Sequence, residues 1–146
     1  MRQKTPKIKN FKFLSHTADV KFQAFGKSLE EAFDNSTLAL TNIICDDQIK
    51  GLKRIDIKVN GNDLESLLYN FLEEVIYVLE TKGFLLDKVK KIKINKEKFR
   101  LEAELAGDKV KNYELSGHFK AITYNDMFVK HDKKKKQWIC QVVVDV

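Results

Sequence analysis

The chain has 146 residues, of which 43% are hydrophobic and 33% are charged, as is typical of one globular domain. It contains no apolar run long enough to span a membrane, and its basic N-terminus lacks the apolar segment of a secretory signal. Its net charge of +6 is compatible with contact to RNA or to an acidic partner. We therefore expect a cytoplasmic, single-domain protein over residues 1–146, with a flexible basic segment at 1–10.

The first part of the chain predicts two short strands and an amphipathic helix. Apolar residues mark the strands at 11–14 and 20–25, on either side of a polar segment. Ser28 and Glu31 then have the spacing of a helix capping box. Apolar residues recur behind them at helical spacing, and we expect this helix to end near Asn42.

A half-buried strand and the longest helix follow. Apolar and charged residues alternate over 54–59, which is typical of a strand with one exposed face. Asn60 and Gly61 predict a turn, Asp63 is placed to cap the second helix, and Gly83 is placed to end it. The wide apolar stripe of this helix indicates that it supports the core.

Beyond Gly83 the pattern predicts only strands, around 89–94 and over 99–105, 118–130 and 138–146. The lysine run 133–136 lies between the last two strands. This run is typical either of a solvated hairpin loop or of a patch that binds phosphate. The order of elements predicts an α+β fold, in which two helices pack on a mostly antiparallel sheet.

Side chains suited to catalysis or zinc binding are widely scattered. His16, His118 and His131 lack the spacing of a zinc motif, and Cys45 and Cys140 are expected to be buried free thiols. The chain also has no glycine-rich phosphate loop and no nucleophile beside a local base. We therefore expect no catalytic residue.

Carboxylates near the two ends of the chain are the most unusual polar groups. Asp19 stands between the first two strands, while Asp145 and the α-carboxylate of Val146 follow an apolar strand. If that strand pairs beside Asp19, three carboxylates converge, and a cation such as Ca²⁺ or Mg²⁺ is needed among them. The alternative is that Asp19 caps a turn and Asp145 is a solvated strand end.

Several segments resemble the archease family, and they occur in the family's order from about residue 11 to residue 146. The resemblance rests on several blocks rather than on one motif. They read FLSHTADV (13–20), AFGKSLEEAF (24–33), LLYNFLEE (67–74), TKGFL (81–85), FKAITY (119–124) and QVVVDV (141–146).

This resemblance implies an accessory protein rather than an enzyme. Archeases act with the GTP-dependent tRNA-splicing ligase of the RtcB type, and they promote its guanylylation and its turnover. The family's divalent-cation ligands carry over onto the side chains of Asp19 and Asp145 and the main-chain oxygens of Val146. Ca²⁺ is the first expectation, with Mg²⁺ or Mn²⁺ as alternatives. Lys120 is expected either to contact phosphate or the partner, or to be a solvated strand lysine.

The chain departs from the family's sequence pattern at two places, and two other functions remain as alternatives. Asn125 stands where the family often has histidine, and the lysine-rich loop 131–137 is particular to this chain. One alternative is a metal-dependent hydrolase that uses a carboxylate-bound water. The other is a general RNA-binding or chaperone-like protein, although a chain with three arginines is poorly equipped to recognise specific bases. Contact with tRNA is otherwise expected to be indirect.

Overall fold

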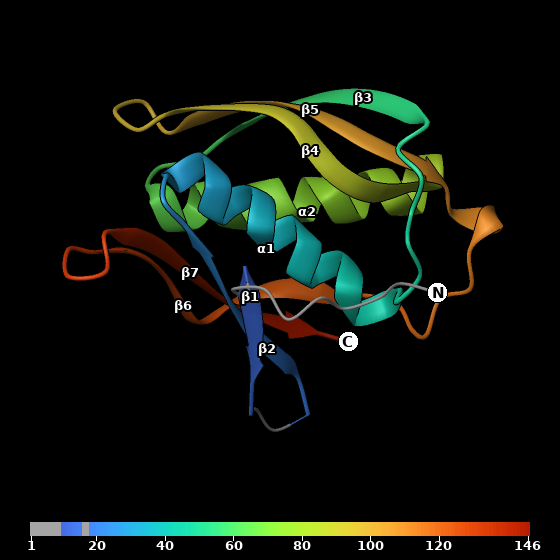
Figure 1. The fold of residues 1–146 in the computed structure, drawn as a ribbon, viewed down its shortest axis with the longest axis horizontal. Helices are drawn as coiled ribbons and strands as arrows, with labels where there is room; N and C mark the ends of the chain where they lie inside the picture. The colour runs from blue at the N-terminus through green and yellow to red at the C-terminus, as the bar shows by residue number, and fades with distance from the viewer. Residues whose placement is uncertain (1–9, 16–17) are drawn as a thin grey trace.

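The computed structural model describes residues 10–15 and 18–146 as three layers, with two helices between two β-sheets (Figure 1). The expected flexible segment at 1–10 therefore lies, except for Asn10, outside the described residues. The elements are β1 (Phe11–Leu14), β2 (Val20–Gly26), α1 (Leu29–Ile44), β3 (Lys53–Asn60), α2 (Leu64–Lys82), β4 (Phe84–Asn95), β5 (Arg100–Lys109), a 3₁₀ turn (Val110–Asn112), β6 (Ala121–Asp132) and β7 (Gln137–Asp145).

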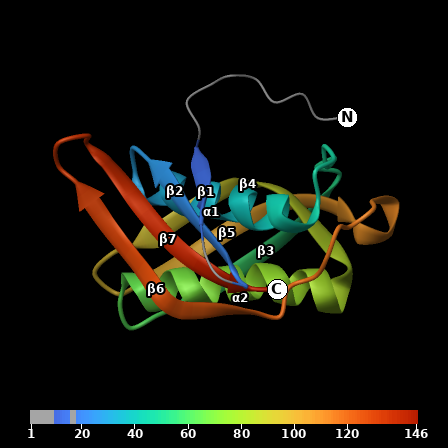
Figure 2. The same cartoon turned by 90° about the horizontal axis from the view of Figure 1, so that it is seen from below.

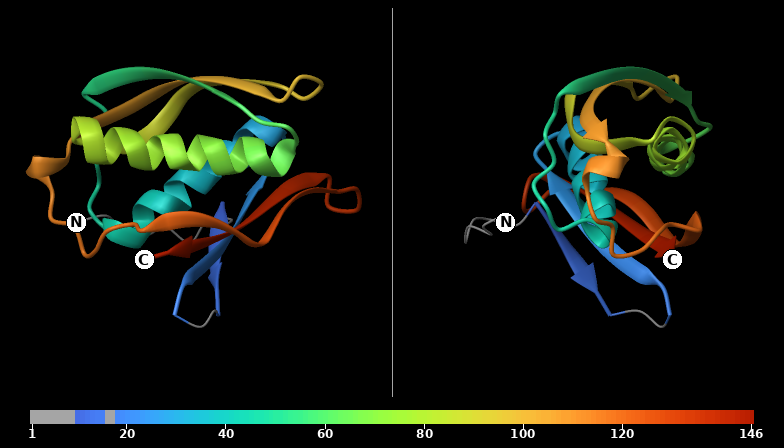
Figure 3. Two further views of the ribbon diagram at one scale, coloured as in Figure 1. Left: turned by 180° about the vertical axis from the view of Figure 1, so that it is seen from behind. Right: turned by 90° about the vertical axis from the view of Figure 1, so that its right-hand side faces the viewer.

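The strands form two separate sheets, with the orders β1-β2-β7-β6 and β3-β5-β4. Every strand pairing among the described residues is antiparallel, as expected. Helix α1 packs against β2 and β4, and α2 packs against β6, β4 and β3, so each helix contacts both sheets. Figure 3 shows the helices enclosed between the sheets from two further directions. The α+β fold is confirmed. The sequence predicted mostly antiparallel sheet but did not show that the strands form two separate sheets.

Helix α1 begins at the expected cap. The Ser28 hydroxyl accepts the backbone N–H of Glu31 at 3.1 Å. In a full capping box the Glu31 carboxylate would accept the backbone N–H of Ser28. Here it accepts the backbone N–H of the preceding residue, Lys27, instead. The helix continues to Ile44, one half-turn beyond the predicted end.

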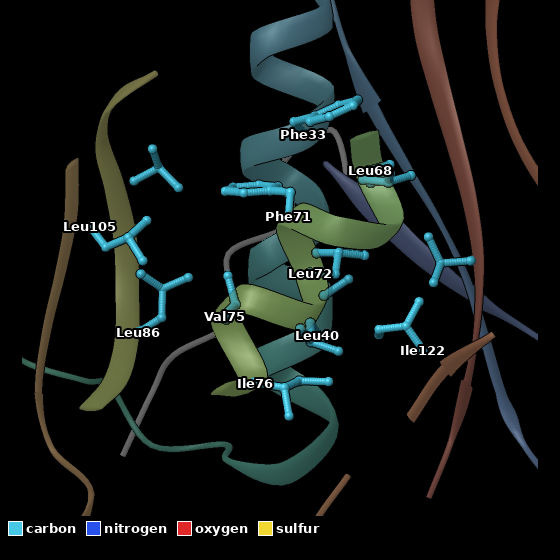
Figure 4. Packing of buried hydrophobic residues seen from close by; sticks show 14 of the residues in the cluster. Phe33, Leu40, Leu68, Phe71, Leu72, Val75, Ile76, Leu86, Leu105 and Ile122 are labelled. Carbon is cyan, nitrogen blue, oxygen red and sulfur yellow. The ribbon is translucent and has the colours of Figure 1, made fainter. Parts of the chain in front are cut away.

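Helix α2 begins and ends at the residues predicted from the sequence. Asp63 accepts the backbone N–H of Ser66 at 2.7 Å, and Gly83 ends the helix with a φ of 60°. Its apolar stripe lies at the centre of the core, where the Phe71 ring stacks on Phe33 of α1 at a centroid distance of 5.9 Å. Figure 4 shows this stripe between apolar side chains of the two sheets, among them Leu105 and Ile122.

Strand irregularities explain why the sequence placed two strands imprecisely. Strand β4 begins at Phe84 rather than near Val89, and its pairing with β5 shifts register at 86/88 and again at 89/91. Each shift interrupts the two-residue alternation on which the prediction depended. Strand β6 runs from Ala121 to Asp132 instead of over 118–130, and it contains a larger bulge.

None of the helices in the described ranges is both long and apolar enough to cross a membrane. Cys45 and Cys140 are both buried and form no disulfide, as expected. Complete burial raises the pKa of the Cys140 thiol to about 12, because the protein interior disfavours the thiolate. Cys140 is therefore a packing residue in the core.

Candidate metal centre

Strand β7, near the C-terminus, lies between β2 from the first part of the chain and β6. Val20 of β2 is paired with Val144 of β7. In this antiparallel register Asp19, one residue before Val20, comes beside Asp145, one residue after Val144. Paired Cα atoms in such ladders lie about 5 Å apart. The register thus brings the backbones of Asp19 and Asp145, which are separated by almost the whole sequence, close to each other.

Strand alternation places the side chain of Asp145 on the outer face of the sheet, away from the helices. Phe22 of β2 and Val144 of β7 point into the core. Residues one position along each strand therefore face outward, and the Gln23–Gln141 side-chain hydrogen bond of 2.8 Å lies on that outward face. Asp145 belongs to the same outward series. Figure 2 views this side of the sheet, with the C-terminus at the end of β7.

Lys120 and Val146 lie at the same place. The backbone N–H of Lys120 donates to the backbone carbonyl of Asp145 at 2.8 Å, while the lysine side chain is exposed. Val146 follows Asp145 directly and is 37% exposed. Strands β2, β6 and β7 therefore bring Asp19, Lys120, Asp145 and Val146 to one end of the sheet.

A bulge in β6 adds residues that the sequence did not single out. Between Thr123 and Phe128 the strand leaves its register with β7, and Asp126 there has a φ of 53°. The Asp126 carbonyl accepts the side-chain amide of Gln141 at 2.7 Å, and its carboxylate lies 3.4 Å from Lys21 Nζ. The bulge therefore folds over the outer face, next to the carboxylate pair.

The donor set has the chemistry of a hard-cation site. Carboxylate oxygens are the ligands that Ca²⁺, Mg²⁺ and Mn²⁺ prefer, and water completes their coordination. Asp19 and Asp145 are only partly buried, so water has access to them. Within the described residues no group of three or more His, Cys, Asp or Glu side chains is placed to hold a metal. Two aspartates fit a cation only if main-chain oxygens of Val146 join them.

The zinc site that the sequence disfavoured does not form among the described residues. His118 precedes β6 and His131 lies near its far end, while His16 falls outside the described residues. Cys45 and Cys140 are buried and no cluster unites them with histidine in the described ranges. The candidate ligands found among residues 10–15 and 18–146 are therefore oxygen atoms.

Comparison with known proteins identifies the fold and its relatives. Residues 11–146 match the Archease protein family (MTH1598/TM1083). The chain is 36% identical to a protein archease of Methanosarcina barkeri over 94% of this chain and 97% of the relative. It is also 36% identical to a protein archease of Pyrococcus furiosus, over 95% and 100% of the two chains.

A solved structure agrees with these sequence matches. The solution structure of Methanobacterium thermoautotrophicum protein 1598 superposes with a TM-score of 0.80 at 27% identity, covering 95% of this chain and all of the other. The family match includes Asp19, Asp145 and Val146. On these grounds the chain belongs to the archease family.

Proposed function

We propose that this chain is a metal-binding activator of the GTP-dependent RtcB-type tRNA-splicing ligase. It promotes guanylylation of the ligase and its repeated turnover, and it has no turnover of its own. Family membership supports the partner. The observation that carries the proposal is the register of β2 and β7, which brings Asp19 beside Asp145 and the end of the chain.

The proposed ligands are the side chains of Asp19 and Asp145 and main-chain oxygens of Val146. A divalent cation, with Ca²⁺ the first candidate and Mg²⁺ or Mn²⁺ next, neutralises the repulsion between these carboxylates. The aspartates and Val146 then hold one end of the sheet as a fixed polar surface. Lys120, attached to the Asp145 carbonyl through its own N–H, presents its exposed ammonium at the edge of that surface.

This surface is proposed to engage the ligase near its active site and to favour the conformation that accepts guanylylation. Strand β7 lies between two neighbours and its residues 140–144 are buried, so the surface rests on a rigid support. A rigid site makes the binding of a partner less costly in conformational entropy. The tRNA then contacts the ligase, and contact with this chain is secondary.

Multiple-turnover ligation by the cognate ligase tests the proposal. With GTP, RNA in excess and this chain substoichiometric to the ligase, we expect many joinings per ligase molecule and about one without the chain. Asp19→Asn and Asp145→Asn should remove most of the stimulation, whereas Asp56→Asn, an exposed carboxylate on β3, should not. Absence of stimulation at every ratio would exclude the activator function. Phosphate release by the isolated chain, lost in Asp19→Ala, would favour the hydrolase instead.

A further inference from the structure

Two basic hairpin turns project from one end of the molecule. They are residues 95–100, from the last residue of β4 to the first of β5, and residues 130–136, from the end of β6 to the start of β7, and both lie at the left of Figure 1. Three cations against one glutamate give the first turn a charge of +2, and five lysines against one aspartate give the second +4. The whole chain has a net charge of +6, so the rest of the chain is neutral in sum.

The two basic turns have the same backbone construction. Asn95 Oδ1 accepts the backbone N–H groups of Glu97 and Lys98, at 3.0 and 3.1 Å. Asp132 Oδ1 accepts those of Lys134 and Lys135, at 3.0 and 3.2 Å. Each side chain fixes its turn, so the lysines project from ordered backbone. Oδ1 of the Asp132 carboxylate therefore accepts hydrogen bonds from the backbone of its own turn.

Each turn closes with a residue in the left-handed region, Phe99 with a φ of 54° and Lys136 with a φ of 52°. Non-glycine residues rarely adopt this conformation unless the surrounding structure holds them there. The recurrence of one strained turn at both hairpin tips shows that their shape is specified and is not that of loose loops.

Aromatic contacts join the two turns into one surface. Lys96 Nζ of the first turn lies 5.6 Å from the ring centroid of Trp138, the second residue of β7. The His131 ring lies 5.1 Å from the same indole. Lys130 adds a contact of 4.4 Å with the Phe128 ring.

The lysines of this surface are exposed. The ion pairs found in the described part of the chain, Lys21–Asp126 and Lys58–Glu102, include none of them. Eight cations are therefore concentrated on two ordered turns, and within the described residues no carboxylate forms an ion pair with them. The lysine run 133–136, which the carboxylate site does not use, belongs to this surface.

We infer that the two basic turns bind the phosphates of RNA without reading its sequence. Lysine ammonium groups act as point charges for phosphate, and the turns contain only Arg100 for bidentate contacts. Trp138 is partly buried under Lys96 and His131, so it is not a free platform for stacking bases. The choice of RNA over an acidic protein rests on the proposed function, whose ligase joins RNA.

The inference assigns the two ends of β7 to different contacts. This strand runs from Gln137, beside the lysine turn, to Asp145 at the carboxylate site. Nine residues at about 3.3 Å each span about 30 Å. RNA held by the turns therefore leaves the carboxylate end accessible to the ligase.

Fluorescence anisotropy with labelled RNA and no ligase tests this inference. The probes are a 20-nucleotide single strand in two unrelated sequences. The test variant replaces Lys133, Lys134, Lys135 and Lys136 by Gln. The matched control replaces Lys53, Lys82, Lys109 and Lys111, exposed lysines at the other end of the molecule, and has the same net charge.

We expect the wild-type chain and the control to bind both sequences similarly, and the test variant to bind at least tenfold more weakly at 50 mM salt. The slope of the logarithm of affinity against the logarithm of salt concentration should fall by about 3, since each lost phosphate contact contributes about 0.7. Equal losses in test variant and control, or unchanged binding in the test variant, would overturn the inference. A second variant, with Lys96 and Lys98 replaced by Gln, should weaken binding by a smaller factor.

The carboxylate variant Asp145→Asn should bind RNA like the wild-type chain, which separates this inference from the proposed function. If the test variant stimulates the ligase fully and no form binds RNA, the inference fails and the activator function stands. If the test variant loses affinity for the ligase rather than for RNA, the turns bind an acidic protein surface and the RNA assignment is wrong. Thermal unfolding of each variant establishes that it is folded.

Discussion

Replacement of Asp34 by asparagine should stabilise the protein above pH 6. The Asp34 side chain lies between α1 and β4, where its carboxylate accepts the backbone N–H of Val89 at 3.4 Å. Burial raises its pKa from 3.8 to about 6, and the charge of Glu31 adds to this effect. The Val89 hydrogen bond and the charge of Lys88 oppose it. Asparagine has nearly the same shape and keeps an oxygen for Val89.

The sign of the effect follows from the two protonation equilibria. Between pH 3.8 and about 6 the folded state holds a proton on Asp34 that the unfolded state has released, so the free energy of unfolding falls as the pH rises. At about 1.4 kcal/mol per unit, a shift of about 2 units costs at most about 3 kcal/mol above pH 6. Partial access of water to this carboxylate reduces the expected cost to about 2 kcal/mol.

Urea unfolding of wild type and Asp34→Asn at unit steps from pH 4 to pH 8 measures this difference. The two proteins should have similar stability at pH 4, and the variant should gain about 2 kcal/mol by pH 8, or roughly 6 °C in Tm. Asp56→Asn, which removes an exposed carboxylate, should follow wild type. A variant that is less stable than wild type at pH 8, or a difference that does not change with pH, would refute the reasoning.

Three further predictions concern the core and the helix ends. Gly107→Ala should abolish or severely reduce stable folding, because its Cβ would collide with the carbonyl oxygen of Leu85; a thermal midpoint near that of wild type would contradict this. Cys45 and Cys140 should not react with a disulfide reagent at pH 8 until the chain is denatured, since both are buried and the pKa of the Cys140 thiol is about 12; rapid native labelling would show otherwise. Ser28→Ala should lower the free energy of unfolding by about 1 kcal/mol through loss of the α1 cap, and an unchanged urea midpoint would argue against that cap.

The helices could be predicted from local sequence because their signals are local. Ser28, Asp63 and Gly83 each form their capping hydrogen bond within five residues, and each occupies its predicted position. The strands were harder to place, because the bulges in β4 and β6 depend on the partner strand. The division into two sheets depends on pairings between distant segments, such as β2 with β7, which no local pattern encodes.

For the same reason, the candidate site could be predicted from the sequence only in part. The polar character of Asp19 and Asp145 at strand ends was visible in the sequence, but their proximity depends on the register of β2 with β7. The bulge that carries Asp126 over the outer face was missed. Adjacent Asn125 and Asp126, residue types that favour turns, were the signal for it inside an otherwise strand-like segment.

Calorimetric titration of Ca²⁺ into the chain, with and without a short Gly-Ser extension after Val146, tests the central claim most directly. The extension turns the terminal carboxylate into an amide and leaves Asp19 and Asp145 unchanged. We predict that one ion binds the unextended chain and that the extension weakens its binding at least tenfold. Equal affinity of the two forms, or no binding of Ca²⁺, Mg²⁺ or Mn²⁺ to the unextended chain, would contradict the assignment of these residues as the metal site.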